Sequence, residues 1–253
     1  MRPAGPSDGA FTVDVRAGTL TPGGGAPMDL YSLEAFRLLA EVWTKAAWQR
    51  RLSYEPRWMG VSVIQMPEDI VMMAELIFHV RPDVIVEIGV AHGGSSLFYA
   101  SLMELAGRGR VVGVDVDIRT HNRSVLEANP LSRRISLIEG SSVAPATAAR
   151  VRNELRPDDA VLVILDSNHT RAHVAAELEA YAPMVTVGSF LVVFDGVMKI
   201  LHDVPNGAPD WTDDNPDAAV RDFLARHPEF RVEPYYNRLM ITHAPGGFLR
   251  RIR

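Results

Sequence analysis

Acidic side chains recur where short apolar runs of this sequence end, and such acids can bind a polar ligand or move a proton. Each run has four to six residues, which is typical of buried parallel strands. The acids, in chain order, are Glu87, Asp115, Asp166 and Asp195. Because ligands bind at the carboxyl edge of a parallel sheet, we expect these acids to border one site.

The stretch DVIVEIGVAHGG, residues 83–94, contains the strongest local signal. An apolar run is followed by a turn with Gly89, Gly93 and Gly94, and Ser95 and Ser96 can then cap a helix. Glycines let the backbone approach a ligand closely, and a helix N-terminus offers free N–H groups. Gly89, Gly93 and Ser95 are therefore predicted to contact a cofactor.

The ligand of this turn is predicted to be S-adenosylmethionine. The spacing is not GxGxxG, which argues against an ordinary dinucleotide site. Glu87, taken as part of the turn, would repel a pyrophosphate but would suit an amino or sulfonium group.

Other residues are assigned to the rest of this cofactor. Asp115 lies twenty-one residues beyond Gly94, where an acid commonly binds ribose hydroxyls. Asp117 is a second candidate, and the alternative for either acid is a helix N-cap. Ser141 and Ser142 follow the strand at 135–138 and are expected to border the adenine.

Periodicity places the remaining elements. Strands are predicted at 84–88, 110–114, 135–138, 160–165, 189–194, 230–232 and 239–242, and helices at 30–52, from 67, at 143–155, from about 170 and at 217–226. Alternating strands and helices predict an α/β fold with a mostly parallel sheet. The short link between the last two strands predicts an antiparallel C-terminal hairpin, and Arg250, Arg251 and Arg253 then form a solvated tail.

The chain is divided into an N-terminal extension and helical lid, 1–66, and an S-adenosylmethionine-binding domain, 67–253. Residues 1–28 are rich in Gly, Pro and Ala, so little regular structure is expected beyond the run 11–15. The helix at 30–52 has two interpretations. It covers a substrate pocket as a lid, or it packs on the core or on a second subunit.

Composition excludes several classes of protein. A hydrophobic fraction of 47% supports a full core, and a net charge of −5 gives no case for nucleic-acid binding. The absence of cysteine excludes disulfides and cysteine-ligated zinc. The first ten residues lack the apolar segment of a signal peptide, and no apolar run is long enough to span a membrane, so a soluble cytoplasmic protein is expected.

Five segments together resemble the cephalosporin hydroxylase family and its sugar O-methyltransferase relatives. They are VEIGVAHGGSSLFYASL, GRVVGVDVDIRTHNR, ISLIEGSSV, ILDSNHTRAHVAAELEAY and GSFLVVFDG, and the likeness covers roughly residues 55–250. The resemblance implies a Rossmann-like class I methyltransferase fold with a seven-stranded sheet. It also implies an S-adenosylmethionine-dependent O-methyltransferase that modifies natural products, with a small-molecule acceptor and a homo-oligomeric state.

Within this family the acceptor is expected to be a deoxysugar hydroxyl, such as that of a rhamnosyl unit, with a cephalosporin-type scaffold as the alternative. The resemblance also implies a divalent metal, such as Mg²⁺, bound by Asp166 and Asp195. Relatives with a metal carry a Glu-Asp pair where this chain has Phe194-Asp195, and phenylalanine cannot ligate a metal. Two carboxylates remain, which suffice for magnesium when water and substrate oxygens complete its shell.

His169, three residues after Asp166, is the predicted general base for the acceptor hydroxyl, because an imidazole titrates near neutrality. Asp166 is the second predicted catalytic residue and is also expected to contact the cofactor. The alternative for His169 is a helix cap. His92, His121 and His173 lack a comparable setting beside strand-end acids, although His92 lies in the glycine turn and could touch a ligand.

Other classes of function stay open at this point. A nicotinamide-dependent oxidoreductase would share the fold, but the glycine spacing and Glu87 count against it. An iron-dependent oxygenase needs two histidines and a carboxylate, and His227-Pro-Glu229 offers only part of that set. A non-catalytic cofactor-binding protein would be distinguished by its lack of turnover.

Overall fold

A computed structural model describes residues 10–253 of the chain. The chain divides into two compact units, Met1–Ala46 and Ala47–Arg253. In the first, β1 (Phe11–Asp14), β2 (Thr19–Pro22) and β3 (Met28–Asp29) form a small antiparallel sheet. β1 lies in the run 11–15, where structure was expected, but the expectation of little regular structure is wrong for residues 16–28, which contain β2 and the start of β3. Residues 1–9 lie outside the described residues. Helix α1 (Leu33–Gln49) confirms the helical prediction.

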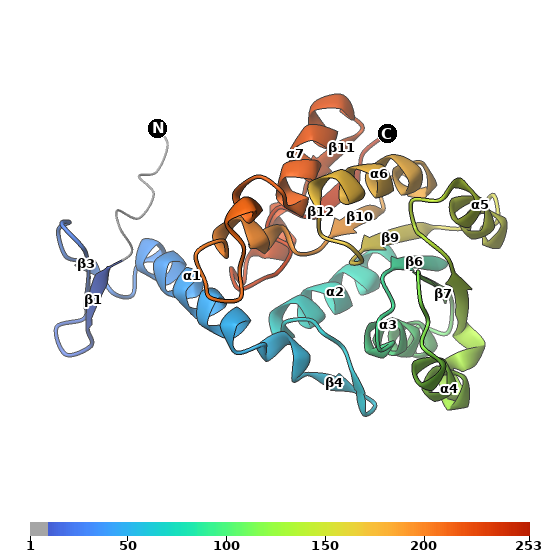
Figure 1. The fold of residues 1–253 in the computed structure, drawn as a ribbon, viewed down its shortest axis with the longest axis horizontal. Coiled ribbons are helices and arrows are strands. Elements are labelled where there is room, and N and C mark those ends of the chain that lie inside the picture. The colour runs from blue at the N-terminus through green and yellow to red at the C-terminus, as the bar shows by residue number, and fades with distance from the viewer. Residues whose placement is uncertain (1–9) are drawn as a thin grey trace. The chain divides into compact units, whose positions relative to one another are not determined.

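The larger unit is built on a seven-stranded sheet in the order β11-β12-β10-β9-β6-β7-β8 (Figure 1). Its strands are β6 (Val84–Ile88), β7 (Arg110–Asp115), β8 (Ile135–Glu139), β9 (Val161–Leu165), β10 (Phe190–Val193), β11 (Phe230–Val232) and β12 (Phe248–Arg251). Five strands, β6 to β10, are parallel, and β12 pairs antiparallel with both β10 and β11. The predicted class I methyltransferase sheet is confirmed.

Helices cover both faces of this sheet. They are α2 (Pro67–Val80), α3 (Gly94–Leu105), α4 (Thr120–Ala128), α5 (Pro145–Glu154), α6 (Arg171–Tyr181) and α7 (Pro216–Arg226). Successive strand residues point to opposite faces, so Val84 and Val86 pack with α5, α6 and α7, whereas Ile85 packs with α2 and α3. Shorter elements are β4 (Arg57–Trp58), β5 (Val61–Ser62) and the 3₁₀ turns at Leu52–Tyr54, Pro130–Arg134, Ala182–Met184, Gly196–Ile200, Pro209–Thr212 and Pro234–Asn237.

The antiparallel strands differ from the prediction in one place. β11 matches the predicted strand, but its partner is Phe248–Arg251 and not residues 239–242, which have no strand structure. The expected solvated tail is thus a strand between two others. The Arg251 guanidinium donates to the backbone carbonyls of Pro183 and Val185, at 3.3 and 2.5 Å.

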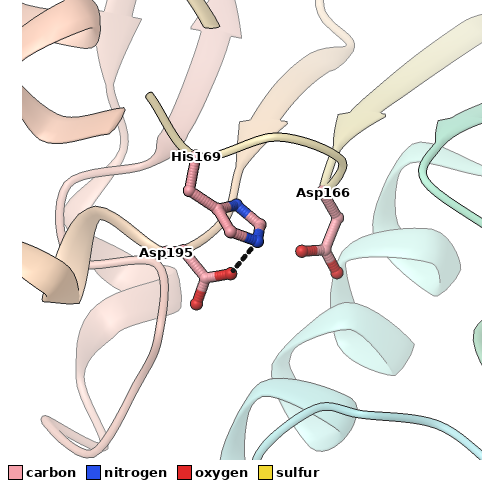
Figure 2. Close-up of side chains that lie close together, drawn as sticks. All are labelled: Asp166, His169 and Asp195. Carbon is pink, nitrogen blue, oxygen red and sulfur yellow. Dashed lines mark ion pairs between the residues drawn. The ribbon is translucent and has the colours of Figure 1, made fainter. Parts of the chain in front are cut away.

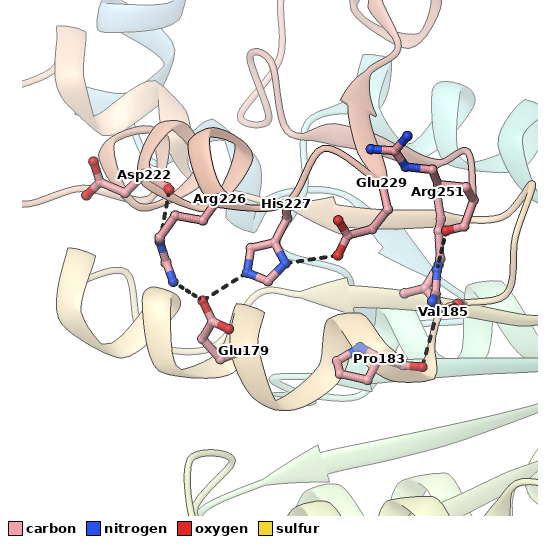
Figure 3. A network of polar contacts seen from close by, with 9 residues as sticks. Glu179, Pro183, Val185, Asp222, Arg226, His227, Glu229 and Arg251 are labelled. Atoms are coloured by element: carbon pink, nitrogen blue, oxygen red, sulfur yellow. Dashed lines mark hydrogen bonds and ion pairs between the residues drawn. The ribbon is translucent and has the colours of Figure 1, made fainter.

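A polar network joins α6, α7 and the start of β11 beside this strand (Figure 3). His227 lies 3.0 Å from Glu229 through Nδ1 and 3.3 Å from Glu179 through Nε2, and its ring stacks on Phe223. Glu179 is also 2.7 Å from Arg226. Both imidazole nitrogens of His227 therefore face carboxylates, and this histidine links α6 to the segment between α7 and β11.

None of the helices in the described part of the chain is both long and apolar enough to cross a membrane.

Candidate active site

The glycine turn after β6 depends on glycine at two positions. Gly89 has a φ of +101°, and a Cβ there would lie 2.0 Å from the backbone oxygen of Asp166. Gly93 has a φ of +86°, and a Cβ there would meet the Leu126 side chain at 2.6 Å. Gly89 thus lets the turn pass close to the end of β9, whereas Gly93 lets α3 pack near α4. Gly93 is the N-cap of α3, so Ser95 and Ser96 are not the predicted caps but lie in its first turn.

Asp115 fixes this turn from the neighbouring strand. Its Oδ2 accepts the backbone N–H groups of Val90 and Ala91, both at 2.9 Å, and its Oδ1 accepts that of Asp117 at 3.2 Å. A carboxylate has about four lone-pair sites, so these bonds leave one for a ligand hydroxyl. The predicted helix cap is not its role, because α4 begins at Thr120 with Arg119 as N-cap.

A cavity of about 420 Å³ lies at the carboxyl edge of β6, β7, β8 and β9, and we call it the glycine-turn cavity. Its lining includes the predicted site residues Gly89, Asp115, Ser141, Ser142 and Asp166, together with Val116, Asn168 and His173. Glu87, Gly93 and Asp117 are not in the lining. Asp117 is exposed at the surface.

Glu87 lies inside β6 and not in the turn where the sequence analysis placed it. The residue is 1% exposed, and its carboxyl group accepts a hydrogen bond from the Ser96 hydroxyl. Burial raises the pKa of Glu87 to about 8, although hydrogen bonds from Ser95 and Ser96 oppose the rise. A raised pKa favours the neutral form of this buried acid, and Glu87 is absent from the cavity lining, so its contact with the cofactor stays a prediction.

A second cavity, of about 370 Å³, adjoins the first, and we call it the histidine cavity. Its lining includes Trp48, Tyr54, Ser95, His169, Asp195 and His243. Both cavities share Gly89, Ala91, Asp166 and Ser167 in their linings. Ligands in the two cavities would therefore meet at Gly89 and Asp166. Trp48 and Tyr54, from the predicted extension, belong to the larger structural unit.

Asp166, His169 and Asp195 all line the histidine cavity and point toward one another (Figure 2). His169 Nε2 lies 3.1 Å from Asp195 Oδ2, and one ligand atom from each of the three side chains falls within 4.8 Å of the others. The N-cap of α6 is Thr170, so His169 is not the helix cap of the alternative interpretation. The three side chains therefore meet at one point of the carboxyl edge, and their roles in catalysis and metal binding stay predictions.

The two carboxyl groups of this centre differ in their environments. Burial raises the pKa of Asp166, and the nearby Asp195 charge raises it further. Burial acts in the same direction on Asp195, but the imidazoles of His169 and His243 outweigh it and hold the pKa of Asp195 below its usual range. Asp195 therefore carries the negative charge beside His169.

His243 is a residue of this centre that the sequence analysis missed. Its Nδ1 lies 3.4 Å from Asp195 Oδ1, so Asp195 stands between two imidazoles. Its backbone N–H donates to the buried Asp69 of α2 at 2.8 Å, and Asp69 also accepts the Thr242 hydroxyl at 2.5 Å. Burial lowers the pKa of His243, but Asp195 and Asp69 more than compensate, and the net pKa is raised. Residues 242 and 243 stand far from Asp69 in sequence, and no local pattern marks this contact.

The setting of His173 was also not recognised from the sequence. It lines the glycine-turn cavity, and its Nε2 lies 3.1 Å from Glu177, one helical turn later on α6. The i, i+4 spacing of a histidine and an acid on one helix face was visible in the sequence.

The donor set of the centre is compatible with a divalent cation. Asp166 and Asp195 present two carboxylates, and hard cations such as Mg²⁺ prefer oxygen ligands completed by water and substrate. Phe194 is 2% exposed and packs in the core beneath the site, so it adds no ligand.

A Rossmann-like sheet, a glycine turn after its central strand and an acidic centre at its carboxyl edge define a class I S-adenosylmethionine-dependent methyltransferase. The family model described as Rhamnosyl O-methyltransferase/CmcI matches residues 50–252. The chain belongs to this family and is an S-adenosylmethionine-dependent O-methyltransferase.

Relatives support this assignment. The chain is 28% identical over 218 residues to a rhamnosyl O-methyltransferase of Mycobacterium bovis, an alignment that covers 83% of this chain and 80% of the relative. A second one, from Mycobacterium leprae, is 33% identical over 144 residues, which cover 54% of this chain and 59% of the relative. A CmcI structure with Mg and S-adenosylmethionine shares the fold, with a TM-score of 0.57, 18% identity and coverage of 79% and 78% of the two chains.

Proposed function

We propose that this enzyme methylates a hydroxyl group of a sugar, such as a deoxysugar unit of a natural product. The observation that carries the proposal is the pair of adjoining cavities that share Gly89 and Asp166. One has the backbone turn and polar edge suited to a nucleoside. The other combines the aromatic rings of Trp48 and Tyr54 with acids and histidines, which suits the CH faces and hydroxyls of a sugar.

In this proposal the glycine-turn cavity holds S-adenosylmethionine. Asp115 accepts a ribose hydroxyl with the lone pair that its backbone contacts leave free, and Ser141 and Ser142 border the adenine. Gly89 and Asp166 form the wall that the two cavities share, so they would lie nearest to the transferred methyl group, and an acceptor hydroxyl would enter from the histidine cavity.

His169 acts as the general base that removes the acceptor proton as the new carbon–oxygen bond forms. It lines the histidine cavity and is absent from the lining of the glycine-turn cavity, as a group that serves the acceptor should be. Asp195, charged and 3.1 Å from Nε2, stabilises the imidazolium that this transfer creates. The Nδ1 atom of His243 lies 3.4 Å from the other carboxylate oxygen of Asp195 and helps to orient it.

Asp166 and Asp195 would hold a divalent metal, which would lower the pKa of an acceptor hydroxyl and orient it. We expect that removing divalent cations with a chelator abolishes turnover and that adding back Mg²⁺ or Mn²⁺ restores it. Product formation over time is the measurement, with circular dichroism as a control that the protein stays folded. Full turnover in chelator would assign the two acids to orientation of His169 and the acceptor alone.

The proposed reaction is tested by incubating the protein with S-adenosylmethionine and a panel of nucleotide-linked deoxysugars and sugar-bearing natural products. Mass spectrometry should detect an acceptor heavier by one methyl substitution, together with S-adenosylhomocysteine. Methylation only of acceptors that lack a sugar would overturn the sugar assignment.

A further inference from the structure

A buried hydrogen-bond network lies at the edge of the glycine-turn cavity, where β8, β9 and α6 meet. Glu177 is fully buried, and its Oε1 accepts the hydroxyls of Ser142 and Ser167, both at 2.5 Å. His173 Nε2 lies 3.1 Å from the same oxygen and 3.0 Å from Ser142 Oγ. Ser142, Ser167 and His173 all line the cavity, whereas Glu177 stands behind them.

This network fixes which nitrogen of His173 carries the proton. Ser142 gives its hydroxyl proton to Glu177, so toward His173 its Oγ can only accept. Glu177 Oε1 is the second acceptor that faces Nε2. A nitrogen that faces two acceptors must be the N–H, so in the neutral form of the ring the lone pair lies on Nδ1.

The Nδ1 atom is the part of His173 that remains for a ligand. Nδ1 has no hydrogen-bond partner among residues 10–253. It is not completely buried, so a ligand can reach it. The side chain is 25% exposed and lines the cavity. A lone pair at the edge of a nucleoside pocket favours a ligand that presents an N–H and disfavours one that presents an oxygen acceptor.

We propose that His173, held in this tautomer by Ser142 and Glu177, selects the 6-amino group of adenine and rejects a 6-oxo purine. This inference deepens the proposed function, because it rests on the cofactor lying in the glycine-turn cavity. His173 is the residue that contacts the base, and Glu177 is a positioning residue that acts through it.

The test compares binding of S-adenosylhomocysteine and S-inosylhomocysteine, which differ in the group at position 6 of the purine. Calorimetry on the native protein should give about a 10- to 100-fold preference for the adenosyl compound. In His173→Leu the preference should fall to within about threefold, mainly because adenosyl binding weakens. His121→Leu, at an exposed position in the first turn of α4, is the matched control and should keep the native preference.

The outcomes separate this inference from the cofactor assignment. If the native protein bound neither compound, the placement of the cofactor would fail. If His173→Leu bound the adenosyl compound with the full native preference, that placement would stand and the role of His173 would be overturned.

A second measurement does not depend on a variant. Nitrogen NMR of labelled histidine should report His173 as the Nε2–H tautomer, with an Nδ1 resonance that shifts when S-adenosylhomocysteine binds. A protonated Nδ1 in the free protein, or an Nδ1 resonance that the ligand leaves unmoved, would contradict the proposal.

Discussion

His169→Ala should lower the turnover number by at least about a hundredfold while leaving the affinity for S-adenosylhomocysteine within about twofold of the native value. A positioned general base contributes about 10²–10⁴-fold, or roughly 3–5 kcal/mol of barrier. His169 lies in the lining of the histidine cavity and 3.1 Å from Asp195, and it does not line the glycine-turn cavity. The loss should therefore fall on chemistry and not on cofactor binding. Steady-state kinetics with a saturating acceptor and calorimetry with S-adenosylhomocysteine measure the two quantities.

Two further variants sharpen this test. His169→Gln keeps a hydrogen-bond donor near Asp195 but cannot take a proton, so it should be as slow as His169→Ala. His202→Ala changes an exposed histidine whose hydrogen-bond partner among residues 10–253 is the Lys199 carbonyl, and it should keep native turnover. A His169→Ala protein that retained more than a tenth of its turnover would assign proton removal to another route. One that lost cofactor binding would make His169 structural.

Glu87→Gln should stabilise the folded protein at alkaline pH and have little effect in acid. The folded-state pKa of about 8 lies above the unfolded value of 4.5, so the folded state binds the extra proton between these limits. The stability contributed by protonated Glu87 is complete below about pH 4.5 and is lost as the pH rises through 8. Each unit of separation corresponds to about 1.4 kcal/mol, which gives a loss on the order of 4–5 kcal/mol across the window. Glutamine has the shape of the neutral acid and avoids this loss.

Chemical denaturation at several pH values measures the effect. The difference in free energy of unfolding between Glu87→Gln and the native protein should grow by several kcal/mol from pH 4.5 to pH 8.5. Asp69, whose pKa burial raises to about 6, contributes equally to both proteins and cancels in the difference. Glu127→Gln makes the same change on the exposed surface of α4 and should show almost no such trend. A difference that stayed constant with pH would mean that Glu87 is ionised in the folded protein.

The central architecture could be predicted from the sequence because it is encoded locally. Each parallel strand is a short apolar run, and each crossover helix has its own periodicity, so β6 to β10 and most helices lie where the pattern placed them. The convergence of Asp166, His169 and Asp195 follows from the same logic, since strand ends of a parallel sheet meet at one edge.

The parts that could not be predicted depend on contacts between distant segments. Asp69 and His243 are 174 residues apart in the sequence but are linked by a hydrogen bond. No sequence pattern near either residue predicts this contact. β12 was missed because Arg250 and Arg251 look like a solvated tail, whereas the chain pairs them with β10 and β11. Glu87 was placed in the turn, whereas it lies inside β6, where burial raises its pKa, and the residue type alone does not reveal burial.

The position of β12 has a consequence for how the chain is made. Synthesis proceeds from the N-terminus, and β11 has no neighbour in the sheet other than β12. β11 therefore cannot join the sheet until residues 248–251 have left the ribosome, and until then the open edge of β10 stays unpaired. An unpaired strand edge is a template for aggregation. Arrest of translation shortly before residue 248 would thus leave a nascent chain with an exposed edge, a natural substrate for a chaperone.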